Sequence, residues 1–389
     1  MTVIIASQSP KSEPASWEFL LAGVDTLDLG LYIRWDNQWE FHVARMETWK
    51  ARAVGTSGLL IDDGVFPIGR TVILPGSKPP MFRYHLQLPE FHVYFSASDI
   101  YRAGPNVYVS LTAETLWRLG VTQAVSLVWG LMEDLGGTVD AIQPSRVDLC
   151  ADFSIPGGLS LGFLRRHRVS RSRATRHFET ADRLETYYVG SGQSPITARI
   201  YDKGLEIQKS RKAWFLSLWG REEGVDVWRV EFQFRRRALK AFKINTMEAL
   251  LEKMAGLWHV VTTRWLGFRL RDAPNLTRRS IHPWWAAVAD CAQRFGEPIE
   301  VDRFEAPPSD SAEWHEKHIA GCLSSFAAIT NRGSFRTALD SLSQRLTDQV
   351  DPDEFRDRIA LKSIKLGKHP PPDDGLPSAL GITDGPFDR

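Results

Sequence analysis

The chain has 389 residues, of which 43% are hydrophobic and 24% are charged, and its formal net charge is only +1. This composition supports a globular core and excludes a chain that is disordered throughout, while the length suggests two domains. The three cysteines, Cys150, Cys291 and Cys322, lie far apart in the sequence, which argues against a disulfide framework or a Cys-rich zinc site.

Residues 1–16 are expected to form a flexible leader. They lack the basic start and the apolar run of a secretory signal, so no such signal is predicted. No stretch of the sequence reaches the roughly 18 consecutive apolar residues of a membrane-spanning helix. We therefore expect a cytoplasmic protein with no membrane association.

Polar and apolar residues then alternate, which predicts β-strands at 24–35, 82–96 and 106–113. Residues 114–135 instead space Leu, Val and Trp at helical intervals, and the glycine pair that follows is typical of a helix end. The next part of the chain predicts a long helix at 246–266 and four more strands, at 146–155, 184–191, 196–207 and 227–236.

This order of elements predicts an α+β fold with a largely antiparallel sheet and packed helices over residues 17–275. Residues 276–350 predict a smaller helical region, with helices at 283–295 and 313–349. Residues 351–389 are expected to be a mostly disordered tail, because their last part is rich in Pro, Gly and Asp.

Positive charge is concentrated between residues 161 and 243, which contain 19 Lys or Arg residues against 9 Asp or Glu residues. A solvated surface would explain one basic run, but two runs flank the same strands, and phosphate backbones attract such patches. We therefore predict DNA binding by Arg165, Arg166, Arg168, Arg171, Arg173, Arg176, Arg235, Arg236 and Arg237.

Side chains alternate between the two faces of a strand, so four of the predicted strands each have one polar face. In RVDLCADF this face carries Arg146, Asp148 and Asp152, and in VWRVEFQF it carries Arg229 and Glu231. If the four strands are neighbours, their polar faces form one site that contains Asp148, Asp152, Glu231, Tyr188, Arg199 and Lys203.

This set of side chains suits phosphodiester chemistry. Carboxylates bind Mg²⁺ or Mn²⁺, and such a cation polarises a phosphoryl oxygen. A tyrosine hydroxyl can attack phosphorus and form a covalent intermediate. Arginine and lysine hold phosphate oxygens.

Each residue also has a purely structural interpretation. A single acid on a strand usually forms a salt bridge, as Asp148 could with Arg146 or Arg229, and tyrosines such as Tyr187 and Tyr188 often pack within sheets. The sequence contains no pair of histidines flanking an apolar residue, no HExxH and no GxxxxGK[ST]. A histidine metal site and an ATP-driven motor are therefore not predicted.

Three blocks, SRVDLCADF, TYYVGSGQSPITARIYDKGLE and VWRVEFQFRR, together resemble the replication initiation factor family. That family includes rolling-circle plasmid initiators, filamentous-phage replication proteins and relaxases of integrative elements. The resemblance covers about residues 24–265. It implies an origin nickase that forms a 5′-phosphotyrosine and leaves a 3′-hydroxyl for a polymerase.

The resemblance also implies roles for individual residues. The family pattern of Thr, apolar, Tyr, apolar, Gly-Ser places its tyrosine on Tyr188, with Tyr187 as the competitor, and the basic residue that often follows Gly-Ser is absent. Three further family blocks match Arg146, Asp148 and Asp152, then Tyr201 to Lys203, then Arg229 and Glu231. We predict Tyr188 as nucleophile, Arg199 and Lys203 at the phosphate, and Asp148, Asp152 and Glu231 as ligands of Mg²⁺ or Mn²⁺.

The expected partner is single-stranded or hairpin DNA of a replication origin. A host helicase or polymerase and a second copy of the chain, as a homodimer, are the further partners considered. Two alternatives stay open: a DNA-binding regulator on the same fold that has lost the chemistry, and a conjugative relaxase of an integrative element with the same chemistry.

Overall fold

A computed structural model describes residues 13–61, 71–78, 81–102, 104–297, 301 and 312–365. The chain divides into two units, Met1–Phe304 and Glu305–Arg389, and the expectations for residues 1–12 and 366–389 lie outside the described residues. Among the described residues, the first unit contains all of the strands, and the second contains three helices, α9 (Ala312–Ile329), α10 (Phe335–Gln349) and α11 (Pro352–Lys365).

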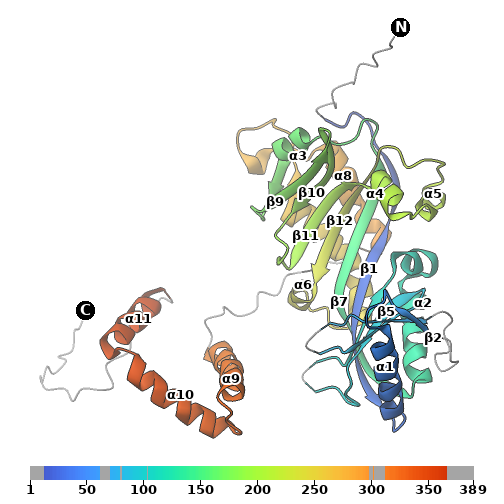
Figure 1. Cartoon of the computed structure of the whole chain (residues 1–389). Coiled ribbons are helices and arrows are strands. Elements are labelled where there is room, and N and C mark those ends of the chain that lie inside the picture. The colour runs from blue at the N-terminus through green and yellow to red at the C-terminus, as the bar shows by residue number, and fades with distance from the viewer. Residues whose placement is uncertain are drawn as a thin grey trace, which may run out of the picture. The chain divides into compact units, whose positions relative to one another are not determined.

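The first unit is built on one antiparallel sheet of eleven strands in the order β2-β3-β4-β5-β6-β1-β7-β12-β11-β10-β9 (Figure 1). Its centre is a pair of 18-residue strands, β1 and β7. The strands are β1 (Glu18–Trp35), β2 (Leu59–Ile61), β3 (Thr71–Leu74), β4 (Tyr84–Gln87), β5 (Phe91–Phe95), β6 (Val107–Leu111), β7 (Gly137–Ser154), β9 (Thr175–Thr180), β10 (Arg183–Val189), β11 (Ile196–Asp202) and β12 (Val227–Arg235).

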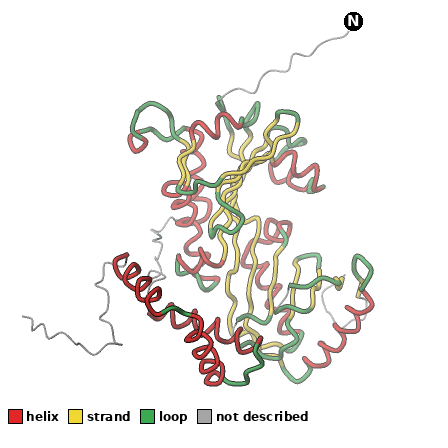
Figure 2. Tube along the Cα trace, turned by 60° about the vertical axis from the view of Figure 1, so that its left-hand side comes forward, coloured by secondary structure: helices red, strands yellow, loops and turns green. Residues whose placement is uncertain are grey.

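A separate two-stranded sheet joins β8 (Arg168–Ser170) to β13 (Leu266–Phe268). Figure 2 shows the twist of the large sheet and the helices packed beside it. The helices of this unit are α1 (Trp39–Ala53), α2 (Ala113–Asp134), α3 (Leu161–His167), α4 (Lys203–Ser210), α5 (Trp214–Trp219), α6 (Arg236–Ala241), α7 (Met247–Val260) and α8 (Pro283–Asp290).

Alternation along the strands separates an apolar from a polar face, as the sequence predicts. On β12, Phe232 points away from Glu231 and packs edge-on against Trp258 of α7, with ring centroids 5.3 Å apart, and it also contacts Trp285 of α8. Aromatic side chains contribute most of the buried apolar area in such a core. The helices α7 and α8 therefore cover the apolar face, which leaves the opposite face of β12 for polar side chains.

The α+β fold with an antiparallel sheet is confirmed, and the differences from the predicted elements have local causes. The strand expected at 196–207 ends at Asp202, because the Asp202 side chain accepts a hydrogen bond from the Leu205 amide (2.8 Å) and begins α4. The helix expected at 246–266 continues beyond Val260 as a π-helical turn, Val261–Trp265. Residues 352–365 form α11 at the start of the predicted tail.

The first unit also extends beyond the expected boundary at residue 275. Trp284 and Trp285 of α8 are fully buried in its core, so this segment is part of the core of the first unit. Within the described residues, no helix combines the length and the apolar character needed to cross a membrane.

Candidate active site

The four strands with predicted polar faces are neighbours in the sheet, in the order β7-β12-β11-β10. Their register aligns Tyr188, Arg199, Glu231 and Cys150 in one row across the four strands. A second row contains Thr186, Tyr201, Arg229 and Asp152. We call the surface that carries these two rows the polar face.

The two adjacent tyrosines of β10 point in opposite directions. Tyr187 belongs to the hydrophobic core, with only 1% of its surface exposed, whereas Tyr188 is half-buried on the polar face. A hydroxyl in the core has no access to DNA. Of the two candidates, only Tyr188 is therefore placed to act as a nucleophile.

Two arginines flank Tyr188. Arg176 of the edge strand β9 lies opposite it on one side, with its guanidinium carbon 4.5 Å from the centre of the Tyr188 ring. Arg199 lies opposite it on the other side. Phe178, which is largely exposed, contacts the ring edge-on with a centroid separation of 6.0 Å. The surroundings of Tyr188 are thus positively charged and partly aromatic.

Arg199 is held in place by Glu231, the next residue in the row. Its Nη2 donates to both carboxylate oxygens of Glu231, at 2.7 and 2.9 Å, and the Tyr201 hydroxyl donates to Oε2 at 3.0 Å. Burial raises the pKa of the Tyr201 hydroxyl well above its usual value, and the Glu231 charge adds to this effect. Burial opposes the charge of Arg199, but Glu231 outweighs it and raises the pKa of Arg199. Arg199 is therefore a fixed cation beside Tyr188.

The second row ends in a closed cluster around Arg229, which is fully buried. Its Nε and Nη2 donate to the two oxygens of Asp152, at 2.6 and 2.8 Å, and its Nη1 pairs with Asp25. Trp219 of α5 donates from Nε1 to the Asp152 carboxylate at 2.9 Å. Burial opposes ionisation of Asp25, but Arg229 outweighs it and lowers the pKa of Asp25 well below its usual value. This cluster fastens α5 to the sheet.

Asp148 lies farther along β7 and pairs with Arg146, whose Nε donates to Oδ1 at 2.9 Å. Burial raises the pKa of Asp148 to about 7, and although Arg146 opposes this shift, the charge of nearby Glu231 adds to it. Neighbouring strands are about 5 Å apart, so the Cα atoms of Asp148 and Asp152 on β7, three strands from β10, lie about 14 Å or more from that of Tyr188. Of the three predicted acids, only Glu231 lies within two strands of the tyrosine.

The carboxylates do not fit the predicted divalent-cation site as they are arranged. Each of the three already has a guanidinium partner: Asp148 has Arg146, Asp152 has Arg229, and Glu231 has Arg199. No group of three or more His, Cys, Asp or Glu side chains within the described ranges is arranged to hold a metal ion. In this arrangement guanidinium groups supply the positive charge at the polar face.

The strand predicted through Lys203 ends before this residue, but Lys203 stays close to the polar face, with its Nζ 5.8 Å from the centre of the Tyr201 ring. It is the first residue of α4, and its side chain is 2% exposed, with Nζ 2.5 Å from Glu206 Oε2 and 4.3 Å from the centre of the Phe215 ring. The backbone at Gly204 approaches the chain at Gly224 so closely that a Cβ there would lie 1.7 Å from the Gly224 oxygen. Lys203 therefore stabilises the junction of α4, α5 and the sheet.

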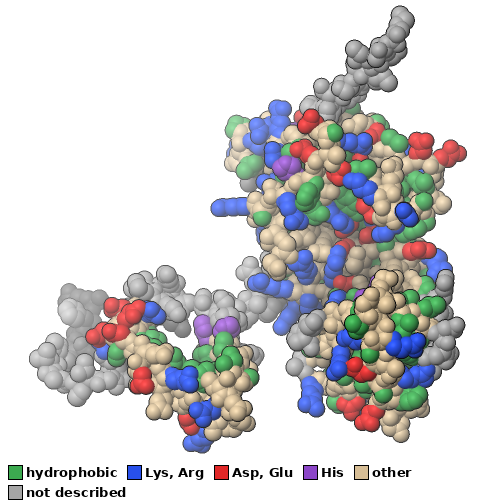
Figure 3. Space-filling model, viewed as in Figure 1, with side chains coloured by type: hydrophobic (Ala, Val, Ile, Leu, Met, Phe, Trp, Pro, Cys, Tyr) green, Lys and Arg blue, Asp and Glu red, His purple; other side chains and the backbone are tan. Residues whose placement is uncertain are grey.

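The nine arginines predicted to bind DNA fall into two groups. Figure 3 shows Lys and Arg side chains gathered where α3, β9 and α6 lie in the first unit. Three guanidiniums are used in local structure: Arg168 donates to Ser172, Arg235 to Gly192 and Gln233, and Arg236 to Pro144 and Ile244. The exposed members are Arg165, Arg166, Arg171, Arg173, Arg176 and Arg237.

Two parts of the polar face were missed in the sequence. Asp25 joins the Arg229 cluster because a register shift between Val24 and Thr26 interrupts β1, and alternation alone does not reveal such a bulge. On the neighbouring strand β6, the Tyr108 hydroxyl donates to Asp28 at 2.8 Å, and Lys78 Nζ lies 3.6 Å from the centre of the Tyr108 ring. The local signal was the alternation of VYVSL, which predicts the polar side of β6 but not its partners.

No protein-family model and no curated protein matches this chain. Among solved structures, it is similar to a rolling circle replication initiator protein from Geobacillus stearothermophilus, with 15% sequence identity and a TM-score of 0.40. The alignment covers 73% of this chain and 100% of that chain. At this level of similarity, function has to be argued from the side chains of the chain itself.

Proposed function

We propose that this protein is a DNA-nicking and rejoining enzyme that initiates rolling-circle replication, with Tyr188 as its nucleophile. One observation carries the proposal: Tyr188 is accessible on the polar face between Arg176 and Arg199, while its neighbour Tyr187 is buried in the core. The resemblance of the strand sequences to replication initiation factors supports the same residue.

The proposed reaction is a phosphodiester transfer. The Tyr188 oxygen forms a bond to phosphorus, the bond from phosphorus to the 3′-oxygen breaks, and that oxygen takes up a proton while the tyrosine loses one. The products are a 5′-phosphotyrosine and a free 3′-hydroxyl, and the reverse attack by a 3′-hydroxyl rejoins the strand. The covalent intermediate conserves the phosphodiester energy.

Two guanidiniums next to the nucleophile suit this reaction. Arg176 and Arg199 bring guanidinium groups next to Tyr188 and can donate hydrogen bonds to the non-bridging phosphate oxygens, where negative charge is concentrated. Glu231 and Tyr201 fix the orientation of Arg199, so this donor is in place before DNA binds.

The proposed substrate is single-stranded DNA, including the loop of an extruded hairpin. Bases in such DNA are already unpaired, so the enzyme does not have to open a duplex. The exposed arginines of α3, β9 and α6 would contact the phosphate backbone. No step of this mechanism passes through a metal ion, because the predicted ligands are engaged with arginines.

A second candidate function is a DNA-binding regulator without nicking activity. It is favoured by the same ion pairs, since salt-bridged carboxylates are also what a purely structural sheet contains. A covalent-adduct assay with a labelled single-stranded oligonucleotide separates the two, because only the enzyme becomes attached to the DNA. A conjugative relaxase would give the same adduct and would differ in the DNA sequence that it cleaves.

A further inference from the structure

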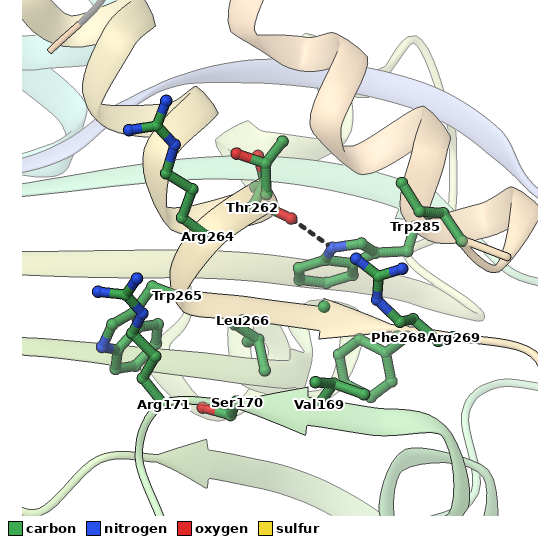
Figure 4. Close-up of a pocket in the computed structure, with 13 residues that line it drawn as sticks. Val169, Ser170, Arg171, Thr262, Arg264, Trp265, Leu266, Phe268, Arg269 and Trp285 are labelled. Atoms are coloured by element: carbon green, nitrogen blue, oxygen red, sulfur yellow. Dashed lines mark hydrogen bonds between the residues drawn. The ribbon is translucent and has the colours of Figure 1, made fainter. Parts of the chain in front are cut away.

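A pocket of about 290 Å³ lies beside the small β8–β13 sheet, between it and α8 (Figure 4). None of the residues around Tyr188 contributes to it. Its described lining contains three arginines, Arg171, Arg264 and Arg269, and no aspartate or glutamate. Arg269 also donates from Nη1 to the Arg279 carbonyl at 2.7 Å, and positive charge at a concave site favours an anionic ligand.

The rest of the lining is aromatic and rigid. Trp285 is buried, and its Nε1 donates to the Thr262 carbonyl at 2.9 Å. Phe268 packs against Trp285 with a centroid separation of 4.8 Å. Trp265 is only partly buried and ends the π-helical turn that begins at Val261, and π-helical turns are frequent at functional sites. The pocket therefore combines a fixed apolar floor with the partly exposed indole of Trp265, which also contacts Phe232 of the core edge-on.

Arg171 is tied to Trp265 by the backbone. Its amide donates to the Trp265 carbonyl at 2.9 Å, so the exposed guanidinium of Arg171 and the indole of Trp265 belong to the same edge of the pocket (Figure 4). Among the described residues, Arg171 has no acidic partner. A ligand with a planar ring and an adjacent phosphate matches this pairing, because bases stack on aromatic rings and arginine holds phosphate oxygens.

The size of the pocket and its position restrict the range of possible ligands further. The volume is at the small end of the roughly 300–1,000 Å³ typical of ligand sites, which suits one nucleotide. Arg171 and Arg176, the arginine over Tyr188, are five positions apart in the sequence, so their Cα atoms are at most about 18 Å apart. At the roughly 3.4 Å per nucleotide of a strand in duplex DNA, that backbone distance corresponds to about five nucleotides.

We propose that this pocket binds one unstacked nucleotide of single-stranded DNA, within about five nucleotides of the phosphodiester that lies at Tyr188. Trp265 stacks on the base, and Arg171 holds a flanking phosphate. The inference rests on the proposed function for the identity of the ligand. It gives the enzyme a means to select its cleavage position, since only a strand with a suitable nucleotide at this distance fills both sites.

Binding and chemistry can be tested separately. Fluorescence anisotropy with a short labelled single-stranded oligonucleotide measures the dissociation constant, using Tyr188→Phe protein so that no strand is cleaved. A single abasic position is then moved along the oligonucleotide. We expect one position at which loss of the base weakens binding roughly 5- to 150-fold, the range for one stacked base. For the Trp265→Ala protein, we expect the dissociation constant to be the same wherever the abasic position lies.

Arg171 provides a second variant that is safe for folding, because its side chain is exposed. We expect Arg171→Glu to weaken single-stranded DNA binding at least tenfold. We expect Arg171→Ala to reduce the slope of log affinity against log salt concentration by about 1, which corresponds to one lost phosphate contact. Arg52→Ala on α1 and Trp129→Ala on α2, both exposed and outside the pocket, are the matched controls and should bind normally.

Three outcomes are decisive. If folded Arg171→Glu and Trp265→Ala proteins bind like the parent protein, the pocket assignment is overturned, whether or not Tyr188 forms an adduct. An equal loss on single-stranded and duplex DNA also overturns it, since it would show general phosphate contact without a bound base. If the pocket variants lose the position-specific effect while the parent protein forms no covalent adduct, the pocket assignment stands and the proposed nicking function fails.

Discussion

Tyr188 on β10 and Arg199 on β11 lie directly opposite each other in the antiparallel sheet, so the strand register itself places a guanidinium beside the phenol. Both carboxylate oxygens of Glu231 accept hydrogen bonds from that guanidinium. The pair is thus fixed by backbone pairing on one side and by an ion pair on the other. We expect the proposed chemistry at Tyr188 to depend on both.

The first prediction concerns the nucleophile. Tyr188→Phe removes only the hydroxyl, so we expect no covalent DNA adduct and single-stranded DNA binding within about twofold of the parent protein, since stacking and charge are retained. The readout is a gel-shifted protein with a labelled oligonucleotide. Tyr187→Phe, changed in the core, is the matched control and should form the adduct. A parent level of adduct in Tyr188→Phe would refute the proposed mechanism.

The second prediction concerns Arg199. Arg199→Lys keeps the charge but loses the paired hydrogen bonds that orient it, and loss of one donor to a developing oxyanion costs roughly 100- to 1,000-fold in rate. We expect slower adduct formation with little change in oligonucleotide affinity. Arg221→Ala, which removes a surface ion pair with Glu18, is the control. Weaker binding at an unchanged single-turnover rate would instead assign Arg199 to DNA binding.

The polar face was predictable from the sequence because alternation determines which residues of a strand share a face. Tyr188, Arg199 and Glu231 follow that rule, and the register aligns them in one row. What alternation cannot supply is the partner of each charge. The pairing of Asp152 with Arg229 depends on α5, whose Trp219 covers the carboxylate, and this contact joins residues 67 positions apart.

The position of Lys203 shows a second limit of prediction from the sequence. The period of two runs without interruption through ARIYDKG, so the sequence predicts a continuing strand and a lysine beside Arg199. The hydrogen bond from the Leu205 amide to Asp202 begins a helix instead, and side-chain capping of this kind competes directly with strand pairing. The close approach of Gly204 to Gly224 is tertiary and has no local signal in the sequence.

The third prediction concerns metal dependence, for which the sequence and the geometry give different expectations. The acids alone predict that a chelator abolishes nicking. Because guanidiniums engage all three carboxylates, we expect adduct formation in chelator to stay within about twofold. The measurement is the single-turnover rate after dialysis against chelator, with and without added Mg²⁺ or Mn²⁺. Complete loss with recovery on addition of either cation would refute this expectation and restore a divalent cation to the mechanism.

The fourth prediction concerns the Arg229 cluster. Asp152→Ala leaves the buried Arg229 with fewer partners, and breaking a buried ion pair on one side costs about 3–5 kcal/mol. We expect the free energy of unfolding in urea to fall by that amount. Asp140→Ala, which breaks the exposed pair with Arg34, should cost less than about 1 kcal/mol. Similar effects of the two changes would show that the Arg229 cluster does not stabilise the fold.

The last prediction follows from the pKa of Asp148, which burial raises from its ordinary value of 3.8 to about 7. Between these two values the folded protein keeps the carboxyl protonated, whereas the unfolded chain loses the proton. The folded state then binds more protons, so this group lowers the free energy of unfolding as pH rises toward 7, by at most about 1.4 kcal/mol per pH unit. Above pH 7 both states are ionised, and the slope disappears.

Asp148→Asn removes this titration and keeps an acceptor for Arg146. We therefore expect the free energy of unfolding of the variant, relative to the parent protein, to increase from pH 5 to pH 7 and to level off at pH 8. Asp140→Asn is the control, because its exposed carboxyl has a pKa lowered by the hydrogen bond from Arg34 and is ionised throughout this range. A constant difference between Asp148→Asn and parent protein from pH 5 to pH 8 would mean that Arg146 keeps Asp148 ionised, and that its ion pair outweighs the cost of burial.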